Sequence, residues 1–155
     1  MTFTILPVDA SDAGSLIEIG MQAFANDTLT QKTMNTHIAT KEQLAEIKEW
    51  RSNILRARLP DPAQLYIKAV DDATGSVAGY TAFKRPRPAS DSPAKKPDIP
   101  EPSFINHEAM KTFDDWSAAT MKRLLEGRED VWCELQCACW RYGCADCKQT
   151  SNRWL

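Results

Sequence analysis

The clearest alternation of apolar and polar residues lies in residues 64–86, QLYIKAVDDATGSVAGYTAFKRP. Two runs rich in β-branched and aromatic residues, Leu65–Val70 and Val77–Phe83, flank the polar segment DDATGS. A period of two is typical of half-buried strands, and Gly75 can supply the positive φ that a tight turn needs. The pattern therefore predicts an antiparallel hairpin.

Residues 2–8, TFTILPV, form a short apolar run around Pro7 and predict a first strand. Residues 9–24 then predict a helix that opens with Ser11 and Asp12 as capping residues. Apolar and small residues recur there at steps of three and four, which places them on one helix face: Leu16, Ile19, Gly20, Ala23 and Phe24. Residues 25–37 are polar and lack a clear period, so they predict a loop with room for a short helical turn.

Thr40 and Gln43 form a capping box, which predicts the start of a second helix. Pro60 and Pro62 cannot continue a helix and therefore mark its end. The expected buried stripe consists of Leu44, Ile47, Trp50 and Ile54. The residues expected to face solvent are Lys41, Glu42, Glu49 and Arg51.

A third helix is predicted between the capping residue Asn106 and a stop at Gly127. Its apolar face would consist of Met110, Phe113, Ser117, Met121 and Leu124. Beyond it, every second residue in one short stretch is apolar or cysteine, which predicts a further strand: Val131, Cys133, Leu135 and Cys137.

Residues 85–103 are rich in proline, with six of the nine prolines of the chain between positions 85 and 102. Such a segment is typical of an exposed insertion. Five basic residues between Lys84 and Lys96 could form a contact patch, although a solvated loop is the interpretation that we favour.

The predicted elements follow the order β-α-α-β-β-α-β, which indicates a mixed α/β fold with a mostly antiparallel central sheet covered by helices. A length of 155 residues suits one domain, residues 1–155, with an irregular Cys-rich tail over residues 133–155. The composition, 43% hydrophobic with a net charge of −2, gives no basis for nucleic-acid binding. The sequence has no apolar run of about 18 residues and its start, MTFTILPVDAS, does not resemble a signal peptide. We therefore expect an intracellular, cytoplasmic protein without membrane contact.

Three segments carry a resemblance to a known family: ILPVDASDAGSLIEIGMQAFANDTL, LAEIKEWRSNILRARLPDP and YIKAVDDATGSVAGYTAFKRP. The third is the most specific, because Gly75, Gly79 and Tyr80 match a G-x-x-x-G-aromatic pattern across the turn. Residues 3–132 resemble the N-terminal two-thirds of GNAT-type acyl-CoA N-acyltransferases of the kind common in fungi. The resemblance implies a partial GNAT fold and transfer of an acetyl group from acetyl-CoA to a primary amine of a small molecule or a protein.

The resemblance also implies roles for individual residues. The fourth strand would offer backbone groups to the pantetheine arm at Leu135 and Cys137, and Glu134 is the only carboxylate in that strand that could act as a base. The candidates for the acceptor site are Phe24, Asn26, Trp50 and Tyr80. The alternative for each of these four is packing in the core or at its rim, and the alternative for Glu134 is a solvent-facing strand position.

The family next requires a turn of the form [R/Q]-x-x-G-x-[G/A] at a helix start, because two phosphates need several N–H donors and closely approaching backbone. Residues 141–145, RYGCA, have neither this spacing nor the second small residue in register. The family pattern is thus expected to stop before the pyrophosphate loop, which would leave an incomplete or weakly active enzyme. The alternative is a non-catalytic interaction module, in which an exposed sheet edge supports a homodimer.

All five cysteines lie between positions 133 and 147, with the spacing C-x3-C-x-C-x4-C-x2-C. This spacing is too tight for two ordinary zinc knuckles, so no metal is favoured, although a small metal-binding protein stays an alternative. Cys144 and Cys147 loosely fit a redox C-x-x-C, and Cys133 and Cys137 could be buried strand residues. The interpretation that we favour is a foreign segment after Trp132, from an alternative exon or a shifted reading frame.

Overall fold

The computed structural model describes residues 2–85, 97–126, 128 and 133–139, with backbone only for Leu125 and for residues 133–139. The proposed helix stop at Gly127, most of the Pro-rich insertion and the tail from residue 140 onward lie outside the described residues.

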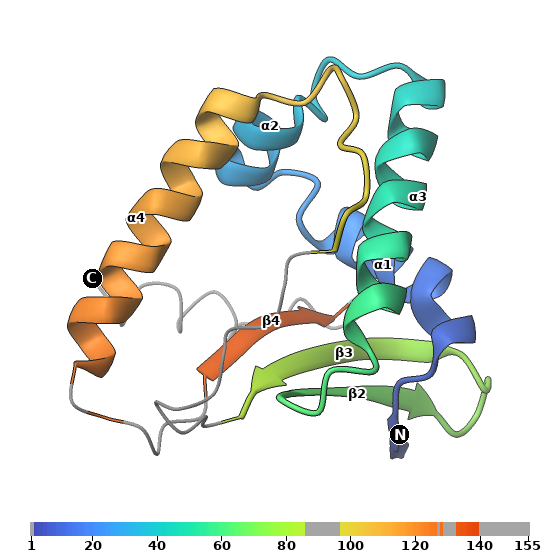
Figure 1. The fold of residues 1–155 in the computed structure, drawn as a ribbon. Helices are drawn as coiled ribbons and strands as arrows, with labels where there is room; N and C mark the ends of the chain where they lie inside the picture. The colour runs from blue at the N-terminus through green and yellow to red at the C-terminus, as the bar shows by residue number, and fades with distance from the viewer. Residues whose placement is uncertain (1, 86–96, 127, 129–132, 140–155) are drawn as a thin grey trace.

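Four strands form one sheet in the order β1-β2-β3-β4, and each neighbouring pair is antiparallel. The strands are β1 (Phe3–Pro7), β2 (Gln64–Asp71), β3 (Val77–Lys84) and β4 (Cys133–Cys139). Figure 1 shows the sheet at the bottom of the molecule, with the helices above it. The predicted mixed α/β fold with an antiparallel sheet is confirmed.

The predicted hairpin is formed by β2 and β3, and its turn is organised by Asp71. The Asp71 carbonyl oxygen accepts a hydrogen bond from the Gly75 N–H at 2.8 Å, and its buried carboxylate accepts one from the Ala73 N–H at 2.9 Å. Gly75 has a φ of 68°, a conformation that residues with a side chain rarely adopt. The turn therefore depends on glycine, as its position in the sequence predicts.

Replacing Gly75 with alanine is expected to lower the free energy of unfolding by about 1 kcal/mol, because the left-handed backbone strains a residue with a Cβ. No atom lies within 4 Å of the added Cβ, so the effect would be one of backbone conformation alone. Gly14 is the matched control, because it is helical and equally open, and Gly14→Ala should be stabilising by about 0.5 kcal/mol. Urea unfolding measures both, and equal signs for the two variants would contradict the argument.

The first helix begins differently from the prediction. A 3₁₀ turn (Ala10–Asp12) precedes α1 (Ala13–Ala23), and its capping residue is Asp9, whose carboxylate accepts hydrogen bonds from the N–H and the hydroxyl of Ser11. Asp12 completes a capping box by accepting from the Asp9 N–H at 2.9 Å, and it makes no capping bond to α1. Asp12 therefore stands at the N-cap position of α1, as predicted, although its side chain caps the 3₁₀ turn and not α1, whereas Ser11 is not a capping residue because Asp9 begins the turn.

A helix, α2 (Thr28–Met34), follows α1 in the segment where a loop is predicted. The Asp27 carboxylate caps it by accepting from the Thr30 N–H at 2.7 Å. The chain thus has three α-helices between β1 and β2 where two were expected.

The two longer helices begin where the sequence predicts. In α3 (Lys41–Arg58), the capping box of Thr40 and Gln43 is present, with hydrogen bonds of 2.9 and 3.3 Å. In α4 (His107–Leu125), the Asn106 side chain accepts from the Ala109 N–H at 3.0 Å. Both predictions are confirmed.

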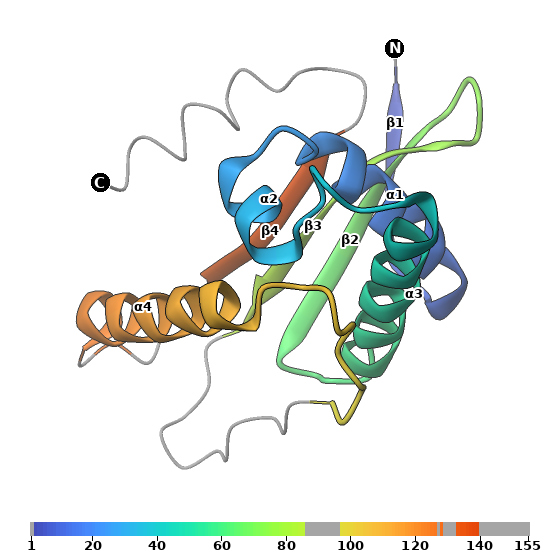
Figure 2. The ribbon, with the colours of Figure 1, turned by 90° about the horizontal axis from the view of Figure 1, so that it is seen from above.

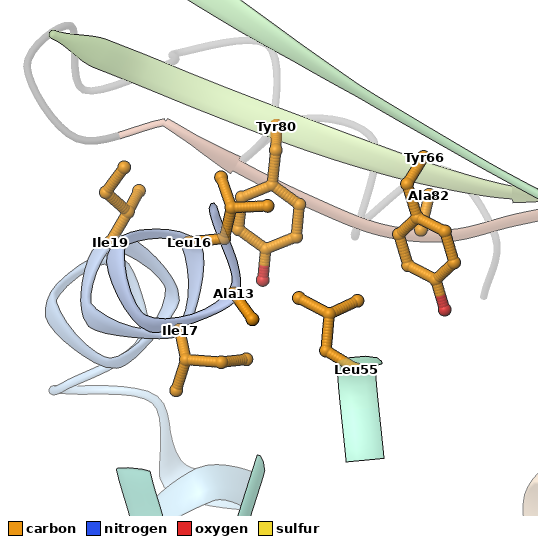
Figure 3. Close-up of a cluster of buried hydrophobic side chains, with 8 residues drawn as sticks. All are labelled: Ala13, Leu16, Ile17, Ile19, Leu55, Tyr66, Tyr80 and Ala82. Atoms are coloured by element: carbon orange, nitrogen blue, oxygen red, sulfur yellow. The ribbon is translucent and has the colours of Figure 1, made fainter. Parts of the chain in front are cut away.

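The core consists of two clusters of buried side chains. The first joins α1, the end of α3 and the sheet, and Figure 3 shows its members: Ala13, Leu16, Ile17, Ile19, Leu55, Tyr66, Tyr80 and Ala82. The second lies between α3 and the segment that leads into α4, and its buried members are Ile47, Trp50 and Ile105. Met21 of α1 packs against both clusters. Seen from above, α1 and α3 lie over the sheet while α4 lies away from α3 and contacts α2 (Figure 2).

An ion pair ties the start of the first helical segment to the sheet. Lys68 of β2 donates to both carboxylate oxygens of Asp12, at 2.6 and 2.5 Å. Both side chains are almost enclosed, with exposed fractions of 12% and 13%. The same carboxylate therefore closes the capping box and neutralises a lysine under the helix.

The described end of the Pro-rich segment differs from a fully exposed insertion. Pro102 is buried, and Ile99 packs against the second cluster together with Phe104. These apolar residues attach residues 97–105 to the helical side of the core. In the described residues, no helix is both long enough and apolar enough to span a membrane.

Candidate functional site

The strand that the resemblance assigns to the acyl donor, β4, pairs with β3 through an irregular register. Phe83 lies opposite Glu134 and Ala82 lies opposite Gln136, so Leu135 has no partner on β3. Such a β-bulge interrupts the ladder and leaves one residue of the bulged strand unpaired with its neighbour. Further along the strand, Cys137 lies opposite Thr81 in the regular part of the register. The bulge therefore falls between the candidate base Glu134 and the candidate backbone contact at Cys137.

Two of the acceptor-site candidates, Phe24 and Tyr80, meet in the first core cluster. Tyr80 is buried on β3 with an exposed fraction of 5%, and its hydroxyl end points toward the helices (Figure 3). Phe24 follows α1, is half-buried and packs against the same cluster. Tyr80 also lies opposite Ala138 of β4, which brings this cluster next to the bulged strand.

The other two candidates lie elsewhere. Trp50 belongs to the second cluster with an exposed fraction of 7%, and its indole Nε1 has no hydrogen-bond partner in the part of the chain that is described. Asn26 is exposed in the turn between α1 and α2. The four candidates are thus not assembled into one site, and their role in acceptor binding stays a prediction.

A cavity of about 220 Å³ lies between α1, α2 and α3, and the sequence analysis did not anticipate it. Its apolar lining comes from all three helices: Met21, Met34, Leu44 and Ile47. Four polar residues also line it: Gln22, Thr30, Thr36 and Arg51. The Thr36 Oγ1 atom is buried and has no hydrogen-bond partner among the described residues. The cavity thus combines an apolar wall with these four polar residues, and a mainly apolar lining with a few polar groups is typical of small-molecule sites.

Arg51 was expected to face solvent, and this expectation is wrong. The residue is half-buried at the wall of a cavity that residues of α1 and α2 also line. Burial lowers the pKa of Arg51, and the phenol of Tyr80 acts in the opposite direction. No sequence signal marks this position, since arginine in an amphipathic helix normally lies on the polar face.

The hypotheses about the five cysteines cannot be compared with side-chain positions, because these residues are either not described or described as backbone only. Cys144 and Cys147 lie outside the described residues, and of Cys133, Cys137 and Cys139 only the backbone in β4 is described. Within the ranges that the structure covers, no group of three or more His, Cys, Asp or Glu side chains could hold a metal ion. The origin and chemistry of the tail stay open predictions.

Neither a family model nor a curated protein matches the chain. A crystal structure described as histone acetyltransferase HPA2 and related acetyltransferase from Corynebacterium glutamicum matches with a TM-score of 0.50 and 16% identity. The match covers 99% of this chain and 72% of that chain. The chain therefore has a GNAT-type acetyltransferase fold, as the resemblance implies.

A second solved structure, the PaiA N-acetyltransferase of Thermoplasma acidophilum in complex with coenzyme A, matches with a TM-score of 0.36 and 16% identity. That match covers 80% of this chain and 74% of that chain. A TM-score at this level is too low to support an argument about the fold or the site.

Proposed function

We propose that the chain is an acyl-CoA-dependent N-acyltransferase that transfers an acetyl group from acetyl-CoA to a primary amine of a small molecule or a protein. The observation that carries this proposal is the bulge at Leu135, within a sheet of the acetyltransferase type. A fold alone does not define an activity, so the proposal depends on this local feature of β4.

In this proposal, the backbone at the bulge binds the pantetheine arm and the thioester of acetyl-CoA. Leu135 has no partner on β3, so the regular ladder is interrupted at its backbone groups. They and the backbone at Cys137 would hydrogen-bond the pantetheine arm and the thioester carbonyl, where negative charge develops during transfer. The pyrophosphate would have to be bound by other groups, and the segment that follows β4 is not described.

The reaction needs an amine without its extra proton. In the proposed mechanism, Glu134 accepts a proton from the ammonium group and the free amine forms a C–N bond with the thioester carbon. The C–S bond then breaks, the nitrogen loses its second proton and the leaving thiolate takes up one proton, which yields the amide and free coenzyme A, and the proton held by Glu134 is released to water. Holding the two reactants against β4 contributes most of the rate enhancement, because no covalent enzyme intermediate is required.

Binding and transfer can be tested separately on the full chain. Acetyl-CoA is expected to give heat in a calorimetric titration and to raise the melting temperature. Transfer to a panel of amines is followed by mass spectrometry of the acetylated product, because the five cysteines would react with thiol reagents. Glu134→Gln should keep acetyl-CoA binding and lower transfer by roughly 10²-fold or more.

Glu126→Gln is the matched control, since Glu126 is an exposed carboxylate just after α4. This variant should bind acetyl-CoA and transfer the acetyl group like the unaltered chain. Absence of any binding at millimolar acetyl-CoA would contradict the proposed function. Equal transfer by the Glu134→Gln variant would remove Glu134 from the mechanism.

A non-catalytic interaction module is the second candidate, and exposed apolar residues on β1 favour it. Ile5 is 61% exposed and Phe3 is 39% exposed, and both belong to a strand at the end of the sheet. Exposed strand edges favour pairing between chains. A homodimer that persists without acetyl-CoA, measured by light scattering, together with no acetyl-CoA binding, would support this candidate over the enzyme.

A further inference from the structure

The cavity between α1, α2 and α3 holds a positive charge without a carboxylate partner among the described residues. Three described lysines have close carboxylate partners: Lys48 lies 2.5 Å from Glu18, Lys68 lies 2.5 Å from Asp12 and Lys111 lies 2.5 Å from Asp115. Arg51 forms no such ion pair within the described ranges. The half-buried guanidinium, which lies beside apolar side chains, could therefore be neutralised by a bound anion.

The cost of this arrangement points to a ligand. A charge removed from water without a partner is unfavourable, and so is a buried hydroxyl without a hydrogen bond. Both conditions occur in the same cavity, at Arg51 and at Thr36 Oγ1. An anion that bound there would neutralise the guanidinium and could accept a hydrogen bond from the Thr36 hydroxyl.

The shape and lining of the cavity restrict the chemistry of that anion. A single guanidinium matches one planar carboxylate, to which it can donate two parallel hydrogen bonds. The apolar part of the wall includes Met21, Met34, Leu44 and Ile47, which suit an aliphatic or aromatic group, and Gln22 and Thr30 add two uncharged polar side chains. A volume of about 220 Å³ is below the roughly 300–1,000 Å³ of sites for drug-sized ligands, so the occupant is small.

We propose that this cavity binds the acceptor substrate, a small apolar amino acid or related amino carboxylic acid, with its carboxylate on Arg51. The amine in this assignment rests on the proposed function, whereas the carboxylate and the apolar group rest on the cavity itself. Helix α1 supplies Met21 to the cavity and also packs on β3 and β4, so one helix borders both the cavity and the proposed reaction strand. Arg51 acts as a specificity residue for the acid group.

Calorimetric titrations of the full chain with three probes that share one carbon skeleton separate the contributions of the ligand's carboxylate and amine to binding. Leucine carries both groups, 4-methylpentanoic acid carries only the carboxylate, and leucinamide carries only the amine. Leucine and 4-methylpentanoic acid are expected to bind, and leucinamide is expected to bind at least about tenfold more weakly because it cannot pair with Arg51. Equal binding of leucine and leucinamide, or no binding of any probe at millimolar concentration, would overturn the proposal.

Variants of α3 provide the second arm of the test. Arg51→Gln should weaken binding of 4-methylpentanoic acid by at least about tenfold. It should preserve or raise the melting temperature, since it removes an unpaired half-buried charge. Arg56→Gln is the matched control, because Arg56 is exposed near the end of the same helix, and it should bind like the unaltered chain. Unchanged binding in Arg51→Gln would refute the role of Arg51, and the comparison of probes on the unaltered chain decides the case if this variant does not fold.

A failure of the proposed carboxylate site can be distinguished from a failure of the proposed acyltransferase function. Because 4-methylpentanoic acid has no amine, its binding does not require acyl transfer. Binding of acetyl-CoA without binding of the carboxylates would refute only the acceptor assignment. Binding of the carboxylates without binding of acetyl-CoA would refute the acyltransferase proposal and leave a carboxylate-binding site.

Discussion

Replacing Leu16 with alanine is expected to lower the free energy of unfolding by about 3 kcal/mol, with a range of about 2–5 kcal/mol. The Leu16 side chain has an exposed fraction of 0% in the first core cluster. Figure 3 shows it between α1 and the sheet, close to Tyr80. Its truncation would remove buried apolar surface and leave a cavity that the surrounding side chains fill only in part.

Leu29 is the matched control for Leu16, because it is a helical leucine with an exposed fraction of 43%. Leu29→Ala should change the free energy of unfolding by no more than about 0.5 kcal/mol. Urea denaturation with matched m-values gives both numbers. A similar small loss for the two variants would show that α1 does not pack on the sheet as described.

Replacing Lys68 with methionine is the second large expected effect, about 3 kcal/mol of lost stability. The substitution keeps an unbranched side chain but leaves the Asp12 carboxylate almost enclosed without its cation. Asp12→Asn should be similarly costly, because it leaves the Lys68 ammonium without its anion. The double variant should lose less than the sum of the two single variants, which a double-mutant cycle measures.

The ion pair of Lys48 and Glu18 is the control for this prediction. Its two side chains are 40% and 45% exposed, so water screens the interaction. Lys48→Met should therefore cost at most about 1 kcal/mol. Additive effects of the Lys68 and Asp12 variants would show that the two side chains do not interact in solution.

The elements that could be predicted from the sequence are those with local determinants. The turn at Gly75 and the capping box of Thr40 and Gln43 depend on residues within a few positions of one another. Helix α2 has a local cap at Asp27 but no clear apolar period, and distant contacts hold it in place. The Thr33 carbonyl accepts from the Asn106 N–H at 2.9 Å, and the Asn35 side chain donates to the Phe104 carbonyl at 2.6 Å.

The candidate site could be predicted only in part, for the same reason. The strand that contains Glu134 is evident from its alternation, but the bulge at Leu135 depends on its register against β3, some fifty residues earlier in the chain. Arg51 looks like a surface residue in an amphipathic helix, and its place in a cavity depends on residues of α1 and α2 that line the same space. Tyr80 was identified through the resemblance, and the structure adds that its ring belongs to the core.

Met21, by its position, links the cavity to both clusters of the hydrophobic core. It is the side chain through which the sheet-side cluster and the helix-side cluster meet, and it also lines the cavity wall. Its unbranched thioether can adopt several rotamers at small cost. A guest molecule that restrained this side chain would tighten both halves of the hydrophobic interior at once, and occupancy would thereby be linked thermodynamically to the cooperativity of the whole domain.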